Sequence, residues 1–337
     1  MTPEATEAWK KLTRLASDNA QRRPPDTGLF EQLSFEAAGL LLDLSKQRLD
    51  TEVLQGLLEL GNECHLQRRM VELVSGAHIN LTEDRPALHT ALRAPASDRP
   101  AIAGPVESTM HRVMVLADSI RQGTWRGYTG KTITDVVHIG IGGSHLGPQL
   151  VVEALVGKHY HGPNIHFVAN IDAANITKSL THLNPERTLF IVASKSFSTL
   201  ETKLNAETAR RWFLERVNRI DAISKHFVAI SSNIEAASQF GIAAENVFEM
   251  WDWVGGRFSV WSPMGLPLAL AIGTAGFQEF LDGARAMDEH FSNTPLNRNL
   301  PVLLALTGIW NYNFLGITNH AILPYAEKLR LLPDYLQ

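Results

Sequence analysis

The chain has 337 residues, 45% of them hydrophobic and 20% charged, which is typical of globular proteins and too apolar for a disordered one. A net charge of −4 argues against a nucleic-acid partner, and a single cysteine, Cys64, excludes an internal disulfide and a cysteine zinc site. The longest apolar stretch, 264–277, is too short and too interrupted to span a bilayer, and the N-terminus lacks an apolar signal core. We therefore expect a cytoplasmic protein of about two domains with no membrane partner.

Residues 1–105 are expected to be mostly helical. Apolar residues from Phe35 to Leu44, followed by the basic residues Lys46 and Arg48, predict a helix with positive charge at its C-terminal end. Proline and glycine are frequent over 93–105, which predicts a boundary there.

After residue 132, short β-branched runs alternate with helical stretches. We predict strands over 135–141, 164–171, 188–193, 226–231 and 246–253. We predict helices over 106–122, 148–156, 173–182, 200–217 and 233–240. Apolar strands that alternate with helices indicate an α/β fold with a doubly wound, five-stranded parallel sheet. Ligands of such sheets bind at the carboxyl ends of the strands, so the residues after each strand are the candidates for a site.

The first predicted strand leads into a glycine-rich turn, residues 140–147, which we call the glycine loop. Glycines let the backbone approach a ligand, and free N–H groups at a helix start attract anions. A dinucleotide fingerprint would need a glycine where His145 stands, so we favour a sugar or phosphate oxygen bound by Gly143 and Ser144. Two alternatives stay open: a dinucleotide site with Asp172 as its ribose ligand, and a tight turn without a ligand.

Four hydroxyls and one lysine follow the third strand at the start of a helix. This hydroxyl loop consists of Ser194, Lys195, Ser196, Phe197, Ser198 and Thr199. Hydroxyl donors, backbone N–H groups and the positive helix end can together hold a phosphate monoester without a metal. The alternative is a capping box, because Ser198 and Glu201 have S-x-x-E spacing. The chain has no G-K-[ST] sequence, which disfavours nucleotide hydrolysis.

The fifth strand is followed by Gly255, Gly256 and Arg257, which we call the arginine turn. Paired glycines bring the backbone close to whatever Arg257 faces, and a guanidinium offers a fixed cationic fork to an oxyanion. The alternative is an ion pair of Arg257 with Asp252 or Glu249. We expect no metal site, because His, Asp and Glu are not spaced as metal ligands.

These segments resemble the glucose-6-phosphate isomerase (phosphoglucose isomerase) family of bacterial type. The resemblance rests on 89–93 (HTALR), the glycine loop, the hydroxyl loop and 252–265 (DWVGGRFSVWSPMG), the last of which matches a family signature almost completely. It implies a sugar-isomerase (SIS) fold, a flavodoxin-like doubly wound sheet. It also implies an N-terminal helical segment over 1–105 as part of a large domain, a sugar-phosphate-binding domain over 106–275 and the start of a second α/β domain over 276–337.

The resemblance also implies an activity, the reversible isomerisation of glucose 6-phosphate to fructose 6-phosphate through a cis-enediol in glycolysis and gluconeogenesis. Gly143 and Ser144 would contact the sugar, the hydroxyl loop would hold the phosphate, and Gly256 and Arg257 would lie beside C1 and C2. The Arg257 cation would there stabilise the enediolate. No cofactor or metal is implied. The family forms homodimers whose site takes a histidine from the neighbouring subunit, so we expect a homodimer of the full-length protein.

The chain departs from the family pattern at two histidines and at its end. The family often has Asn at the position of His138 and Asp at that of His145, and the sequence offers no reason for either histidine. The family's general base, its ring-opening histidine and a lysine follow the position of Gln337. We therefore expect these 337 residues to bind substrate but to be inactive by themselves. The alternative is a non-catalytic sugar-phosphate-binding module.

Residues 309–324 are expected to begin a second sheet. Partner strands would come later in the chain, so an apolar face of this region would lie uncovered and solubility would be poor. The residues of that face are Leu303, Leu304, Leu306, Ile309, Trp310 and Phe314.

Overall fold

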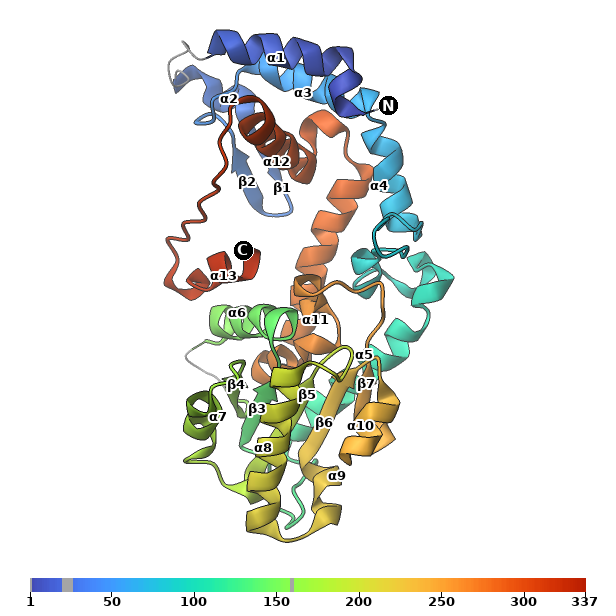
Figure 1. Cartoon of the computed structure of the whole chain (residues 1–337), viewed down its shortest axis with the longest axis vertical. Helices are drawn as coiled ribbons and strands as arrows, with labels where there is room; N and C mark the ends of the chain where they lie inside the picture. The colour runs from blue at the N-terminus through green and yellow to red at the C-terminus, as the bar shows by residue number, and fades with distance from the viewer. Residues whose placement is uncertain (1, 20–26, 158–160) are drawn as a thin grey trace. The chain divides into compact units, whose positions relative to one another are not determined.

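A computed structural model describes residues 2–19, 27–157 and 161–337 of the chain (Figure 1). The chain forms two compact units, one of Met1–Pro86 with Asp282–Ala321 (unit 1) and one of Ala87–Leu281 with Ile322–Gln337 (unit 2). The three-part division expected at residues 105 and 275 stays a prediction.

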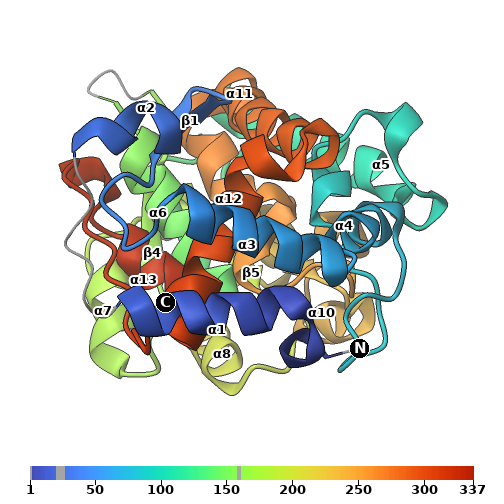
Figure 2. The same ribbon diagram turned by 90° about the horizontal axis from the view of Figure 1, so that it is seen from above.

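Unit 1 is mainly helical. Its helices are α1 (Glu7–Asn19), α2 (Phe30–Leu33), α3 (Thr51–Glu63), α4 (Leu66–Ser75) and α12 (Leu300–Ile309), with the last part of α11 (Leu266–Asn293). Helices α1 and α3 lie side by side (Figure 2). They meet closely at Gly56, where a Cβ atom would lie 3.0 Å from Cδ2 of Leu12. Leu12 and Leu57 are fully buried in the core that these helices form.

A β-hairpin occupies the place of the helix that we predicted over 35–48, so that prediction is wrong. Strands β1 (Ser34–Ala37) and β2 (Leu40–Asp43) pair antiparallel. The two residues between them, Ala38 and Gly39, both have left-handed backbones, with φ of 50° and 74°. Such a two-residue turn matches the twist of a hairpin, and it overrides the helical spacing of the leucines. The hairpin leaves Leu40 and Leu41 exposed.

Helix α12 continues into a π-helical turn, Trp310–Phe314, and no strand forms over 309–324, so the second sheet expected there is absent. Helical spacing places Leu303, Leu306 and Trp310 on one face, which is buried in the core of unit 1. The Trp310 indole Nε1 donates a hydrogen bond to the Arg48 carbonyl at 2.7 Å. The expectation of an uncovered apolar face is therefore wrong for these residues, although Leu304 is exposed.

Unit 2 contains the α/β fold that we predicted. Five parallel strands lie in the order β4-β3-β5-β6-β7. They are β3 (Asp135–Ile139), β4 (Asn164–Val168), β5 (Thr188–Ala193), β6 (Phe227–Ser231) and β7 (Val247–Glu249). The helices of this unit are α5 (Pro105–Arg121), α6 (Leu146–Leu155), α7 (Ala173–Leu180), α8 (Leu200–Val217), α9 (Ile223–His226), α10 (Ile234–Phe240), the first part of α11 and α13 (Leu332–Leu336). Each strand lies within the range predicted for it from sequence, and β6 and β7 begin one residue after the start of that range.

Two apolar cores cover the two faces of this sheet, which confirms the doubly wound fold. One core contains residues of α5, α6 and α11, and the other contains residues of α7, α8 and α10. In the second core the rings of Phe190 on β5 and Phe227 on β6 stack with their centroids 4.6 Å apart. Residues of β3 and β5 alternate between the two cores, as expected for strands buried on both faces.

Helix α11 is broken within unit 2 at Gly273, whose backbone is left-handed with φ of 86°. The segment Pro263–Asn293 is, among the described residues, long and apolar enough to cross a membrane by length and composition. More than half of its apolar window is buried inside the protein, as expected for a core helix. Arg121 of α5 donates two hydrogen bonds of 2.8 Å from Nη1 to the carbonyls of Leu270 and Ala271, just before the break.

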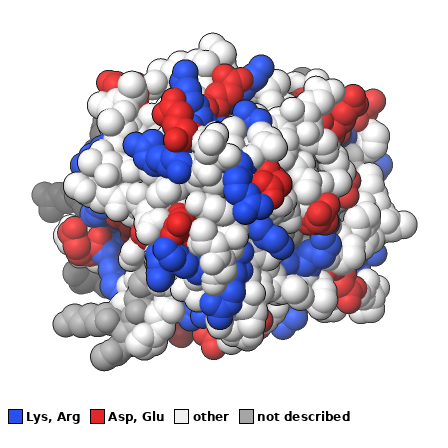
Figure 3. Space-filling view, turned by 90° about the horizontal axis from the view of Figure 1, so that it is seen from below, with Lys and Arg blue, Asp and Glu red and all other residues white. Residues whose placement is uncertain are grey.

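Acidic and basic side chains are interspersed on the face of the molecule seen in Figure 3. Arg219 and Asp221 form one exposed ion pair of unit 2.

Candidate active site

Three loops that follow parallel strands form the candidate site, all in unit 2. They are the glycine loop after β3, the hydroxyl loop after β5 and the arginine turn after β7. Strands β3 and β5 are hydrogen-bonded neighbours, with Ile139 opposite Val192 near their carboxyl ends. The glycine and hydroxyl loops therefore start beside each other at one edge of the sheet.

The glycine loop contacts the arginine turn through bare backbone. A 3₁₀ turn, Gly142–Ser144, lies between β3 and α6, and Gly142 has a left-handed backbone with φ of 56°. A Cβ atom on Gly143 would lie 2.2 Å from the carbonyl carbon of Gly256 and 2.4 Å from its oxygen. Glycine at position 143 is therefore required by this contact, and the structure brings two of the predicted site residues together.

His138 donates a hydrogen bond to the carbonyl of Ser144 in this loop. This bond is a physical reason for a histidine at position 138, for which the sequence offered none. Its Nε2 lies 2.7 Å from the Ser144 carbonyl oxygen, so Nε2 carries the proton and donates. Burial in the core lowers the pKa of His138 to about 4 and keeps the ring neutral. The rings of His138 and His145 both pack against Phe167, at centroid distances of 5.5 and 5.7 Å. Burial also lowers the pKa of His145.

A cavity of about 450 Å³ lies beside the glycine loop. It is lined by Ile141, Gly142, His145, Leu146, Gln149, Phe167, Ala169, Asn170 and Asn175. No lining residue comes from the hydroxyl loop or the arginine turn, and none is a lysine or arginine. Over the described ranges of the chain, no three His, Cys, Asp or Glu side chains are grouped as a metal site.

The hydroxyl loop presents its hydroxyl groups at the start of the 18-residue helix α8. The N-cap is Thr199, and no side chain caps the helix, so the capping box of Ser198 and Glu201 does not form. The Ser198 hydroxyl instead donates to the Ser196 hydroxyl at 2.7 Å, and the Ser194 hydroxyl lies 3.4 Å from that of Thr199. These groups therefore lie at the positive end of a helix without serving as its cap.

Phe197 contributes its backbone to the loop. Its φ of 56° is left-handed, which is uncommon for a residue other than glycine. Its N–H donates to the Ser194 carbonyl at 3.1 Å, and its ring packs edge-on against Phe240. The ring thus anchors the turn, and such outliers cluster at ligand-binding loops.

Lys195 joins the hydroxyl loop to the segment before the arginine turn. Its Nζ donates to the carbonyls of Asp252 at 2.8 Å and Val254 at 3.1 Å. Its own carbonyl accepts hydrogen bonds from the hydroxyls of Ser231 and Ser232. Lys195 therefore fixes the position of one loop against the other.

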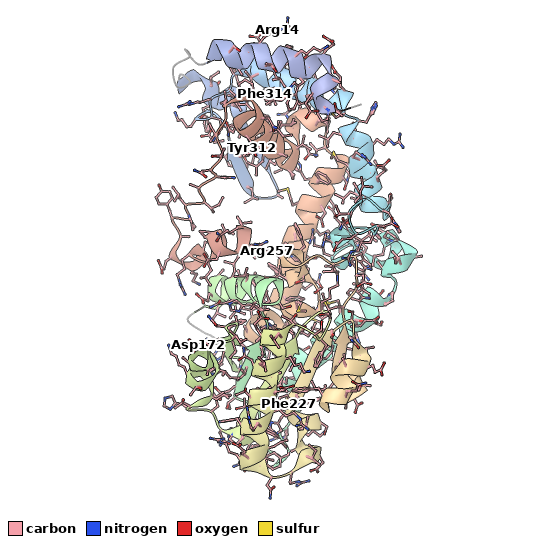
Figure 4. All side chains as sticks on the ribbon, in the orientation of Figure 1. Arg14, Asp172, Phe227, Arg257, Tyr312 and Phe314 are labelled. Atoms are coloured by element: carbon pink, nitrogen blue, oxygen red, sulfur yellow. The ribbon has the colours of Figure 1, made fainter. Side chains whose placement is uncertain are left out.

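Arg257 is exposed, and its guanidinium forms no hydrogen bond or ion pair with any residue that the structure describes (Figure 4). Arg257 forms no ion pair with Asp252 or Glu249, which was the alternative; Asp252 lies near Lys195, with an Oδ1 to Nζ distance of 3.9 Å. The Arg257 cation is thus available for an anion from outside the chain.

His89 is a site residue to which residue-level reasoning assigned no role. Its Nε2 accepts a hydrogen bond from the Gly255 N–H at 2.8 Å, and its ring packs against Phe258. Burial, with the charges of Arg93 and Lys195, lowers the pKa of His89 to about 4, so the ring is neutral at pH 7 and can accept. The only sequence signal was its place in the HTALR segment.

Asp172 caps helix α7, so its side chain has a structural role (Figure 4). Its Oδ1 accepts from the Ala174 N–H at 2.8 Å. We expect Asp172→Ala to lower the free energy of unfolding by about 1 kcal/mol, the usual effect of losing an N-cap, and Asp172→Asn to lower it by far less. Urea unfolding of both variants measures this. Equal losses would show that the carboxylate charge, and not the cap, matters.

Comparison with known proteins places the chain in a family. The family model for phosphoglucose isomerase matches residues 43–337. The chain is 47% identical to glucose-6-phosphate isomerase 1 of Chromohalobacter salexigens over 98% of its own length and 62% of that protein's length. It is 49% identical to the glucose-6-phosphate isomerase of Saccharophagus degradans over 98% of its own length and 60% of that protein's length.

A solved structure agrees with these matches. The crystal structure of a glucose-6-phosphate isomerase from Chlamydia trachomatis is 30% identical, with a TM-score of 0.86 over 100% of this chain and 66% of that one. The chain thus spans about three fifths of the length of the curated relatives it matches. Sequence and fold together show that the chain belongs to the phosphoglucose isomerase family.

Proposed function

We propose that this chain binds a hexose 6-phosphate and provides the substrate-binding part of a glucose-6-phosphate isomerase, which interconverts glucose 6-phosphate and fructose 6-phosphate. The observation that carries the proposal is the hydroxyl loop, whose hydroxyls lie at the start of α8 and do not cap it. Relatives named glucose-6-phosphate isomerase support the choice of substrate.

In this proposal the phosphate dianion lies at the hydroxyl loop. Ser194, Ser196, Ser198 and Thr199 donate from their hydroxyls, and the backbone N–H groups of the first turn of α8 add to them. Lys195 belongs to the same loop, but its Nζ donates to the carbonyls of Asp252 and Val254. We therefore assign it the task of holding the loop against the arginine turn.

The sugar carbons then extend from the phosphate past Gly143 and Ser144 towards Arg257. Moving a proton between C1 and C2 creates an enediolate, and the exposed Arg257 cation can stabilise the negative charge as it forms. Gly143 and Gly256 touch, so the sugar-binding loop and the backbone that carries Arg257 are held at a fixed separation. The base that moves the proton is not among the residues assigned here.

Ligand-dependent stability tests the binding. Fructose 6-phosphate at about 100 times its dissociation constant should raise the free energy of unfolding by about 2.7 kcal/mol. Fructose without phosphate and NADH should leave it unchanged. The absence of any shift with about millimolar fructose 6-phosphate, in a folded sample, would contradict the proposal.

A hydroxyl variant locates the phosphate. We expect Ser198→Ala to weaken fructose 6-phosphate binding about tenfold, because a hydrogen bond to a charged group contributes about 1.5 kcal/mol or more. Ser224→Ala is the matched control, since the Ser224 hydroxyl donates to the Asp221 carbonyl, away from the loop. Titration calorimetry measures both. Equal affinities of the two variants would place the phosphate elsewhere.

A further inference from the structure

The arginine turn is held by three side chains, of which two, His89 and Tyr335, come from distant parts of the chain. The Gly255 N–H donates to His89, and the Gly256 carbonyl accepts from the Ser259 hydroxyl at 2.6 Å. The next carbonyl, that of Arg257, accepts from the hydroxyl of Tyr335 at 2.9 Å. Three consecutive residues therefore each have a backbone group fixed by a side chain.

Tyr335 lies on α13, in the last segment of the described chain, and this segment docks on α6. Arg330 forms an ion pair with Glu153 of α6, and the Lys328 Nζ donates to the Val156 carbonyl at 3.2 Å. Figure 1 agrees, with α13 beside α6. The contacts with α6 therefore hold this segment near the site independently of its hydrogen bond to Arg257.

The ring of Tyr335 also contacts the glycine loop. A Cβ atom on Gly147 would lie 3.1 Å from Cε2 of Tyr335, so the ring rests on the bare backbone of this glycine. Burial between these elements raises the pKa of the Tyr335 hydroxyl, which stays protonated and can donate. One side chain therefore touches both the glycine loop and the arginine turn.

We propose that Tyr335 is a positioning residue for Arg257, which fixes the backbone from which the guanidinium projects. The inference rests on the proposed function of Arg257. The Arg257 side chain is exposed and has no partner among the described residues, so the backbone position from which it starts is what limits where the guanidinium can reach. A charge that is held in place before the reaction stabilises a developing anion better than one that must first be ordered.

The test compares two ligands on the same 337-residue chain. Fructose 6-phosphate carries its charge at the phosphate only, whereas a five-carbon aldonate phosphate adds a carboxylate where the enediolate would carry its charge. We expect Tyr335→Phe to weaken binding of the aldonate phosphate about tenfold and to leave fructose 6-phosphate binding within about twofold, since the lost hydrogen bond acts only through Arg257. A general structural defect would weaken the binding of both ligands alike, and that result would overturn the inference. An unchanged ratio of the two affinities would also overturn it.

Two further variants sharpen the result. Tyr325→Phe is the matched control, because Tyr325 lies in the same segment and is 99% exposed, and it should leave both affinities unchanged. In an Arg257→Ala background, Tyr335→Phe should have no further effect on the preference for the aldonate phosphate, as a double-mutant cycle requires. Independent effects of the two changes would overturn the inference. Failure of the unmodified chain to bind fructose 6-phosphate would instead overturn the proposed function, and this inference with it.

Discussion

Replacing Gly143 by alanine is expected to remove ligand binding and to lower the free energy of unfolding by about 3 kcal/mol. The new Cβ would lie 2.2, 2.4 and 2.6 Å from the carbonyl carbon, oxygen and Cα of Gly256. All three are backbone atoms, so no side chain can turn aside, and the glycine loop and the arginine turn must separate. Urea unfolding and titration with fructose 6-phosphate measure the two effects.

Substitution of Gly256, the other residue of this contact, provides the control. A Cβ on Gly256 would meet only the Gly143 Cα, at 3.9 Å, an ordinary van der Waals distance. Gly256→Ala should therefore lower the free energy of unfolding by about 1 kcal/mol or less. If the two alanine variants were equally stable, the loops would not be in contact as described.

Acid should destabilise unit 2 strongly, because His138 and His89 are held neutral in the folded chain. Both have a pKa lowered from 6.5 to about 4, mainly by burial. Above pH 6.5 neither state binds the proton and there is no effect. As the pH falls from 6.5 towards 4, the unfolded chain takes up protons that the folded chain does not, so stability is lost. Each histidine contributes a loss of up to about 1.4 kcal/mol per pH unit, or about 3 kcal/mol by pH 4.

A single substitution separates this effect from general acid unfolding. His138→Asn removes one of these groups, so the difference in unfolding free energy between about pH 7 and pH 5 should shrink by about 1–2 kcal/mol. His182→Asn is the matched control, because His182 is exposed in the folded chain. Denaturant unfolding at both pH values provides the comparison. An unchanged difference in His138→Asn would mean that His138 binds its proton equally well in both states.

The parts of the fold that sequence predicted are those set by local patterns. The strands and helices from 135 to 240 follow from short β-branched runs that alternate with helical stretches. The hairpin at 34–43 was missed because four leucines in five residues suit a buried helix as well as a strand. Only the left-handed Ala38 and Gly39 decide between these, and alanine gives no signal for such a backbone.

The site shows the same limit. The glycine loop, the hydroxyl loop and Arg257 could be chosen because each follows a strand, but their mutual contacts depend on the tertiary fold. Nothing near Lys195 in sequence indicates that its Nζ holds two carbonyls more than 50 residues away. His89 and Tyr335 act on Gly255 and Arg257 across 166 and 78 residues of chain, so no local pattern could have pointed to them.

The break at Gly273 changes how the apolar segment of α11 should be understood. The guanidinium of Arg121 donates hydrogen bonds to the carbonyls of Leu270 and Ala271. A cation at these carbonyls stabilises the C-terminal end of the helix before the break. The segment is therefore two consecutive helices, and the side chain of Arg121 caps the first of them before the second begins. The 31 residues of Pro263–Asn293 are therefore divided at Gly273, and neither helix by itself has the full apolar length.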